Sequence, residues 1–105
     1  MRIAPLGIAF PLAIGLVVNA ALANDQKPTN DPKHGKTLFG EHCSLCHGAN
    51  AEGGLGPSLK GELKRKTAEQ IRAQIMNPEP PMAKLYPSIL SQKDVDDVVA
   101  YVVTL

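Results

Sequence analysis

The chain has 105 residues and a formal net charge of +1, with 20% of its residues charged. This length suffices for one small domain, and the near-neutral balance argues against a nucleic-acid partner. Aromatic residues make up 4% of the chain and tryptophan is absent. A domain this small, with so few large apolar side chains, struggles to build a sufficient core from protein alone.

Residues 1–23 have the pattern of a secretory signal peptide. Arg2 supplies a positive start, residues 3–18 contain no charge, and Ala21-Leu22-Ala23 is a small-residue cleavage signature before polar Asn24. The alternative is an uncleaved membrane anchor. The apolar run argues against it, because the run is short for a membrane span and is interrupted by prolines. We expect cleavage before Asn24, export to the periplasm and no stable membrane span afterwards.

Residues 24–30 are polar and aperiodic, and we expect a flexible segment there, ahead of a domain at 31–105. Asp31 as N-cap and Pro32 in the first helical position predict the start of a helix. One face of this helix carries residues at helical spacing: Gly35, Leu38, Phe39 and His42. Gly35 lowers the helix propensity of this segment. We expect that its missing side chain leaves room for another helix to cross closely. The alternative is that Gly35 has no role and only weakens the helix.

The next stretch, Cys43-Ser44-Leu45-Cys46-His47, contains the only two cysteines of the chain. Cys-x-x-Cys-His is typical of covalent attachment of a c-type haem. Two thiols one helical turn apart can form thioethers with the two vinyl groups of one porphyrin, and His47 then lies under the iron as proximal ligand. The sequence therefore predicts one covalent haem c on Cys43, Cys46 and His47.

Three other kinds of site also use neighbouring cysteines. A thioredoxin-like dithiol expects a βαβ context, which the chain after residue 23 does not show. A structural zinc site needs four ligands, and His42 and His47 flank the cysteines too tightly to close a tetrahedron easily, even with His34. A disulfide across two residues would stabilise little. Export favours the haem interpretation, because bacterial c-type haem is attached outside the cytoplasmic membrane.

Four glycines after His47 predict an irregular loop at residues 48–57. At this point the chain resembles a small bacterial class I cytochrome c. The resemblance lies in Gly-Lys-Thr-Leu-Phe before the haem motif, Gly-Pro-Ser-Leu after it and Pro-Pro-Met further on. It implies an all-α fold in which the N- and C-terminal helices cross and loops enclose the haem. It also implies that the Pro57 carbonyl accepts a hydrogen bond from the Nδ1–H of His47. The alternative is that Pro57 is an ordinary turn residue.

A basic run follows at Lys60, Lys64, Arg65 and Lys66. A solvated face is the default interpretation of such a run, and a docking surface for an acidic redox partner is the functional one. Thr67 and Gln70 then form a capping box for a helix through about Met76, with Ile71 and Ile75 as its apolar stripe.

Residues 78–87 contain four prolines, which favours a stiff, extended loop. A thioether from such a loop suits the sixth position of a haem iron, and we predict Met82 as the second axial ligand. Met76 is the rival, although we expect it to pack on the preceding helix. His34 would give bis-histidine ligation, but the resemblance puts the first helix in the wrong part of the chain for a distal ligand.

Ser91 and Asp94 form an approximate capping box for a last helix. Its valines recur at helical spacing, at Val95, Val98, Val99 and Val102. Valine also suits strands, but the cap favours a helix. The resemblance implies that this helix crosses the first near Gly35, with Phe39 and Tyr101 packing at the crossing.

Together these features predict a periplasmic, monohaem class I cytochrome c that carries one electron and is not an enzyme. The iron would cycle between Fe(II) and Fe(III) with His47 and Met82 both bound. Redox proteins would be its partners. Two alternatives stay open: a haem subunit of a larger redox enzyme, and a five-coordinate, ligand-binding haem protein if Met82 is not axial.

Overall fold

The computed structural model describes residues 30–105, and within that range it contains helices and no β-strand. The elements are helices α2 (Pro32–His42), α3 (Ser44–His47), the 3-10 turn η1 (Glu62–Lys64), α4 (Ala68–Met76) and α5 (Gln92–Val102). This arrangement confirms the all-α prediction. The predicted signal peptide and all but Asn30 of the predicted flexible segment lie outside the described residues.

Side-chain caps start the three longer helices. The Asp31 carboxylate accepts hydrogen bonds from the first backbone amides of α2. Thr67 with Gln70, and Ser91 with Asp94, form reciprocal capping boxes at α4 and α5. These amides would otherwise lack partners, because the first turn of a helix has no carbonyls before it. The predicted starts of all three helices are confirmed.

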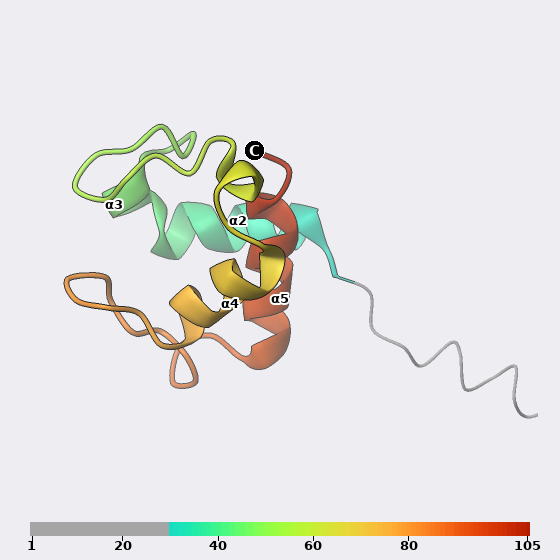
Figure 1. Cartoon of the computed structure of the whole chain (residues 1–105). Helices are drawn as coiled ribbons and strands as arrows, with labels where there is room; N and C mark the ends of the chain where they lie inside the picture. The colour runs from blue at the N-terminus through green and yellow to red at the C-terminus, as the bar shows by residue number, and fades with distance from the viewer. Residues whose placement is uncertain (1–29) are drawn as a thin grey trace, which may run out of the picture.

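Helices α2 and α5 cross in close contact (Figure 1). A Cβ placed on Gly35 would lie 1.9 Å from the backbone oxygen of Asp97, so only glycine fits there. One turn further along, the rings of Phe39 and Tyr101 pack edge to face with centroids 5.4 Å apart. The predicted apolar faces meet at this crossing, where the buried side chains are Leu38, Phe39, Val95, Val98, Val99 and Val102. The expected helix crossing at Gly35 is confirmed.

The buried carboxylate of Asp97 ties the start of α2 to α5. It is 1% exposed and accepts from the backbone N–H of Asp31 at 2.8 Å, from Lys93 Nζ at 2.6 Å and from His34 Nδ1 at 2.7 Å. Burial opposes ionisation of Asp97, but these hydrogen bonds outweigh it and lower its pKa. The hydrogen bond to Asp97 in turn raises the pKa of His34.

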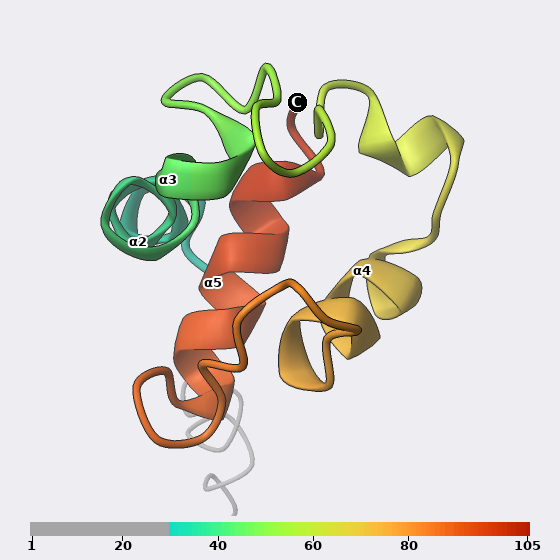
Figure 2. The ribbon, with the colours of Figure 1, turned by 90° about the vertical axis from the view of Figure 1, so that its left-hand side faces the viewer.

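Helix α4 packs against α5 through its predicted stripe, since Ile71 and Ile75 are buried. Arg72 adds an ion pair to Asp96 of α5 at 2.7 Å. The loop after α3 and the loop after α4 lie at opposite ends of α5, as Figures 1 and 2 both show. None of the helices in residues 30–105 has the length and hydropathy that a membrane crossing requires.

Candidate haem site

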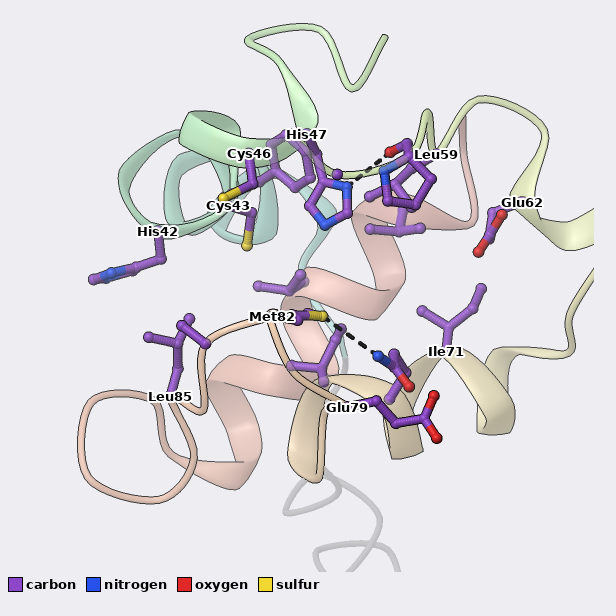
Figure 3. A pocket seen from close by; sticks show the side chains of 18 of the residues that line it. His42, Cys43, Cys46, His47, Leu59, Glu62, Ile71, Glu79, Met82 and Leu85 are labelled. Atoms are coloured by element: carbon purple, nitrogen blue, oxygen red, sulfur yellow. Dashed lines mark hydrogen bonds between the residues drawn. The ribbon is translucent and has the colours of Figure 1, made fainter. Parts of the chain in front are cut away.

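A cavity of about 590 Å³ lies between the two loops and is floored by the crossing helices (Figure 3). Cofactor sites in proteins occupy roughly 300–1,000 Å³ and are mostly apolar. The lining here is mostly apolar too, and includes Phe39, Leu59, Ile71, Ile75, Leu85 and Val98. The cavity therefore has the size and chemistry of a site for a large apolar group.

Cys43, Cys46 and His47 all line one wall of this cavity. The short helix α3 brings them together, because the backbone N–H of His47 donates to the Cys43 carbonyl at 3.0 Å and completes one turn. No disulfide joins the two cysteines. Figure 3 shows the Cys43 sulfur and the His47 imidazole pointing toward the level of Met82, with Cys46 next to Cys43 on the same wall.

The His47 ring is held in one orientation. The side chain is buried, and its Nδ1–H donates to the carbonyl of Pro57 at 2.8 Å, as the resemblance implied. Gly56 lies against the ring, where a Cβ would stand 2.9 Å from His47 Cε1. A protonated, occupied Nδ1 leaves Nε2 as the nitrogen with a free lone pair, which is the form that a metal ligand requires.

Backbone hydrogen bonds attach the loop after α3 to the haem motif. The N–H of Gly53 donates to the His47 carbonyl at 2.6 Å, and the N–H of Gly56 donates to the Cys46 carbonyl at 2.8 Å. The N–H of Leu59 closes the loop on the Ala51 carbonyl at 2.9 Å. The four glycines predicted an irregular loop, and the structure shows that this loop folds back onto α3.

Met82 lines the opposite wall of the cavity and is half-buried. Its Sδ accepts a hydrogen bond from Gln74 Nε2 of α4 at 3.6 Å (Figure 3). Neither rival lines the cavity: Met76 packs against the core, and the His34 ring is bonded to Asp97. His42 does line it, but the residue is exposed and its ring points away from the space between His47 and Met82 (Figure 3).

A lysine fastens the Met82 loop to the end of α4. Lys84 Nζ donates to the Met76 carbonyl at 2.8 Å and lies 3.4 Å from Asn77 Oδ1. A cation at this point also meets the negative end of the helix dipole. Gln74 thus holds the loop at Met82 itself, and Lys84 holds it two residues further on. Sequence reasoning missed both residues, because nothing in their spacing marks a contact to a loop.

The structure divides the predicted basic run. Arg65 and Lys66 face the buried carboxylate of Glu62, with closest atoms 2.6 Å and 3.8 Å apart. Lys60 and Lys64 are exposed, and neither has an ion-pair partner among residues 30–105. Glu62 itself was missed, although its position three residues before Arg65 and four before Lys66 is a helical ion-pair spacing.

The geometry also bears on the other interpretations of the cysteine pair. Burial, with a smaller contribution from Cys46, raises the pKa of the Cys43 thiol to about 11. A reactive dithiol needs the opposite shift. Among the described residues, no three His, Cys, Asp or Glu side chains gather to hold a metal ion, as a structural zinc site would need. Two thiols and an imidazole facing a thioether across an apolar cavity fit a c-type haem.

Comparison with known proteins agrees with this site. Residues 30–102 match the family described as cytochrome c oxidase, cbb3-type, subunit III. The chain is 33% identical over 76 residues to a cytochrome c-553-like protein of Synechocystis sp. (strain ATCC 27184 / PCC 6803 / Kazusa), covering 71% of this chain and 70% of that protein.

A second relative is a dihydro-heme d1 dehydrogenase of Pseudomonas aeruginosa. Here the identity is 37% over 70 residues, which covers 66% of this chain but only 13% of that longer protein. No solved structure matches the chain. The family match spans most of the described residues, and it agrees with the helical fold and the Cys-x-x-Cys-His site. The chain therefore belongs to the cytochrome c family and is a small class I c-type cytochrome.

Proposed function

We propose that the protein carries one haem c, bound covalently through Cys43 and Cys46, with His47 and Met82 as the two axial ligands. The observation that supports this most is the opposition of the His47 imidazole and the Met82 thioether across one cavity (Figure 3). When bound, the haem supplies one-electron chemistry between Fe(II) and Fe(III).

The surrounding residues each have a defined task in this proposal. Pro57 holds the proton on Nδ1 of His47, so that Nε2 faces the cavity unprotonated. Gln74 donates to one lone pair of the Met82 sulfur and leaves the other free. The apolar lining excludes water and disfavours the additional positive charge of the oxidised iron. This raises the reduction potential of the haem. Since protein contacts hold both ligands, little has to move between the two redox states.

On this basis the protein acts as a one-electron carrier of the periplasm, and not as an enzyme. Its partners are redox proteins, and Lys60 and Lys64 are the residues of the basic run that are free to meet an acidic partner. Such steering would appear as an electron-transfer rate that falls with salt and with Lys60→Ala or Lys64→Ala.

A second candidate is a haem subunit of a larger redox enzyme. One observation favours it: part of a longer protein named a dehydrogenase is similar to this chain. Co-purification from native membranes and extracts separates the two, because a free carrier elutes at its own mass, whereas a subunit elutes with its catalytic partner.

The axial assignment is tested by the absorption spectrum of the haem-loaded protein. The oxidised protein is expected to show the weak band near the red edge that sulfur–iron ligation produces. Met82→Ala should abolish this band and allow carbon monoxide to bind the reduced form. Met76→Leu is the matched control and should leave the band intact, because Met76 does not line the cavity. An unchanged spectrum in Met82→Ala would overturn the assignment. Absence of the band from the wild-type protein, together with carbon monoxide binding, would favour the five-coordinate alternative.

A further inference from the structure

We propose that Arg65 is a positioning residue for the proximal ligand. It ties the segment that follows Pro57 to the buried carboxylate of Glu62, and thereby keeps the Pro57 carbonyl on the Nδ1–H of His47. This inference rests on the proposed function, in which His47 binds the iron.

The first step is the ion pair itself. Arg65 donates to Glu62 Oε1 through Nε at 2.9 Å and through Nη2 at 2.6 Å. Glu62 is 8% exposed and lines the same cavity as His47. A buried carboxylate is costly unless it is paired and hydrogen-bonded, so Glu62 holds the guanidinium in one place.

The second step leads from the guanidinium to the loop. The same Nη2 donates to the carbonyl of Lys60 at 3.0 Å and reaches that of Ser58 at 3.4 Å. These two carbonyls belong to the first and the third residue after Pro57. A planar guanidinium can bind the carboxylate and the backbone at the same time, whereas the ammonium group of a lysine is a compact point charge.

The third step concerns the Pro57 carbonyl. The Pro57 carbonyl shares one planar peptide unit with the nitrogen of Ser58, so the direction of this carbonyl depends on how Ser58 is held. The Ser58 hydroxyl donates to the Ala51 carbonyl at 3.2 Å and accepts from the Lys60 N–H at 3.3 Å, and the Ser58 carbonyl accepts from Arg65 at 3.4 Å. Loss of Arg65 leaves the Ser58 hydroxyl and the neighbouring Leu59 N–H, which donates to Ala51, to hold the peptide that follows Pro57.

Two neighbours show that charge alone does not define this role. Lys64 lies in the same turn and carries the same charge, yet it has no hydrogen bond to the loop and no ion pair among residues 30–105. Lys66 lies 3.8 Å from Glu62 Oε2 and makes no hydrogen bond to residues 57–60. Lys64→Met is therefore a matched control, because it removes one positive charge from the same turn and leaves the contacts of Arg65 in place.

The test follows the His47 Nδ1 proton by NMR in the haem-loaded, reduced protein. In Arg65→Met we expect this proton to exchange with solvent at least roughly tenfold faster than in wild type, because the carbonyl that covers it is less firmly held. Its resonance and the reduction potential should both differ from those of Lys64→Met, whose exchange rate should equal that of wild type. Arg65→Lys keeps a charge beside Glu62 and should give an intermediate rate.

Equal exchange rates in Arg65→Met and Lys64→Met would overturn the inference. If Arg65→Met fails to load haem, the same comparison is made with Arg65→Lys, and a rate equal to that of Lys64→Met is then the contradicting result. Failure of the proposed function looks different, because the wild-type protein itself would show no haem-shifted Nδ1 proton of His47.

Discussion

The two walls of the cavity are built in different ways. The wall at residues 43–61 carries His47 and is joined to α3 by backbone hydrogen bonds between residues close in sequence. The wall at residues 77–90 carries Met82, and its attachment to α4 depends on the side chains of Gln74 and Lys84. For the wall that carries His47, the proximal wall, we therefore expect substitution of its own side chains to change stability little. A group that crowds its backbone should change stability more. For the wall that carries Met82, the distal wall, we expect each side-chain substitution to cause only a small loss of stability.

The largest effect is expected from removal of the haem that we propose lies between the two walls. Without haem, the apolar lining of a cavity of about 590 Å³ is exposed to water. A domain this small buries too little other apolar surface to compensate. The haem-free Cys43→Ala/Cys46→Ala protein should lose most of its helical circular dichroism and show no cooperative thermal transition. A retained transition would mean that the walls support themselves.

The next effect concerns the crossing that supports both walls. Gly35→Ala places a methyl group 1.9 Å from the Asp97 oxygen and forces α2 and α5 apart, at a cost of about 3 kcal/mol. Gly40→Ala is the matched control in the same helix. It meets nothing within 4 Å and should gain up to about 1 kcal/mol in helix propensity. Denaturant unfolding of the haem-loaded proteins measures both, and equal stabilities would refute the crossing argument.

Gly56→Ala tests crowding of the proximal wall. The new methyl group would stand 2.9 Å from His47 Cε1 and 3.4 Å from the Cys46 carbonyl oxygen. Because backbone bonds hold the loop and the Pro57 carbonyl holds the ring, we expect a loss of about 2 kcal/mol in unfolding free energy. The reduction potential should change as the ring tilts. If neither quantity changes, the proximal wall is as adaptable as the distal one.

Gln74→Leu tests the distal wall and should have a smaller effect. It removes the donor to the Met82 sulfur, at a cost of about 0.5–1 kcal/mol. With Met82 as the proposed axial ligand, its sulfur should then leave the iron more readily. Added imidazole should therefore bind the oxidised variant faster than it binds the oxidised wild type. A loss of stability larger than that of Gly56→Ala would reverse the comparison between the walls.

The smallest effect is a pH dependence at the Asp97–His34 contact. The lowered pKa of Asp97 gives stability that is present above its unfolded value near 3.8 and lost as pH falls through the folded value. The raised pKa of His34 gives stability that is complete below 6.5 and lost as pH rises through the folded value. His34→Gln should flatten the alkaline limb of the melting temperature against pH and keep the acid limb. An unchanged alkaline limb would exclude His34 as its origin.

Much of the architecture could be predicted because it depends on neighbours in the chain. Caps at Asp31, Thr67 and Ser91 satisfy amides two or three residues away, so the helix starts were predicted correctly. The haem motif is also local, since one turn of helix brings Cys43 and His47 to the same wall. The crossing at Gly35 could be predicted because a glycine on an apolar helix face leaves room for the backbone of a second helix.

Other parts could not be predicted, because their partners lie on different elements. The spacing of Glu62 to Arg65 suits an ion pair, but nothing in the sequence showed that Glu62 is buried or that Lys64 in the same turn stays in solvent. Gln74 is an ordinary polar residue of α4 until the loop brings the Met82 sulfur beside it. Asp97 likewise looked like one of several acids near the start of a helix.

The sequence by itself determined the helices, the haem motif and the candidate ligands, because each of these depends on residues within a few positions of one another. Only the tertiary structure decided how the ligands are held. Burial sets the role of Glu62 and Asp97, since a carboxylate removed from water must find its partners wherever the fold supplies them. The contacts of Arg65 and Gln74 depend in the same way on where separate segments meet.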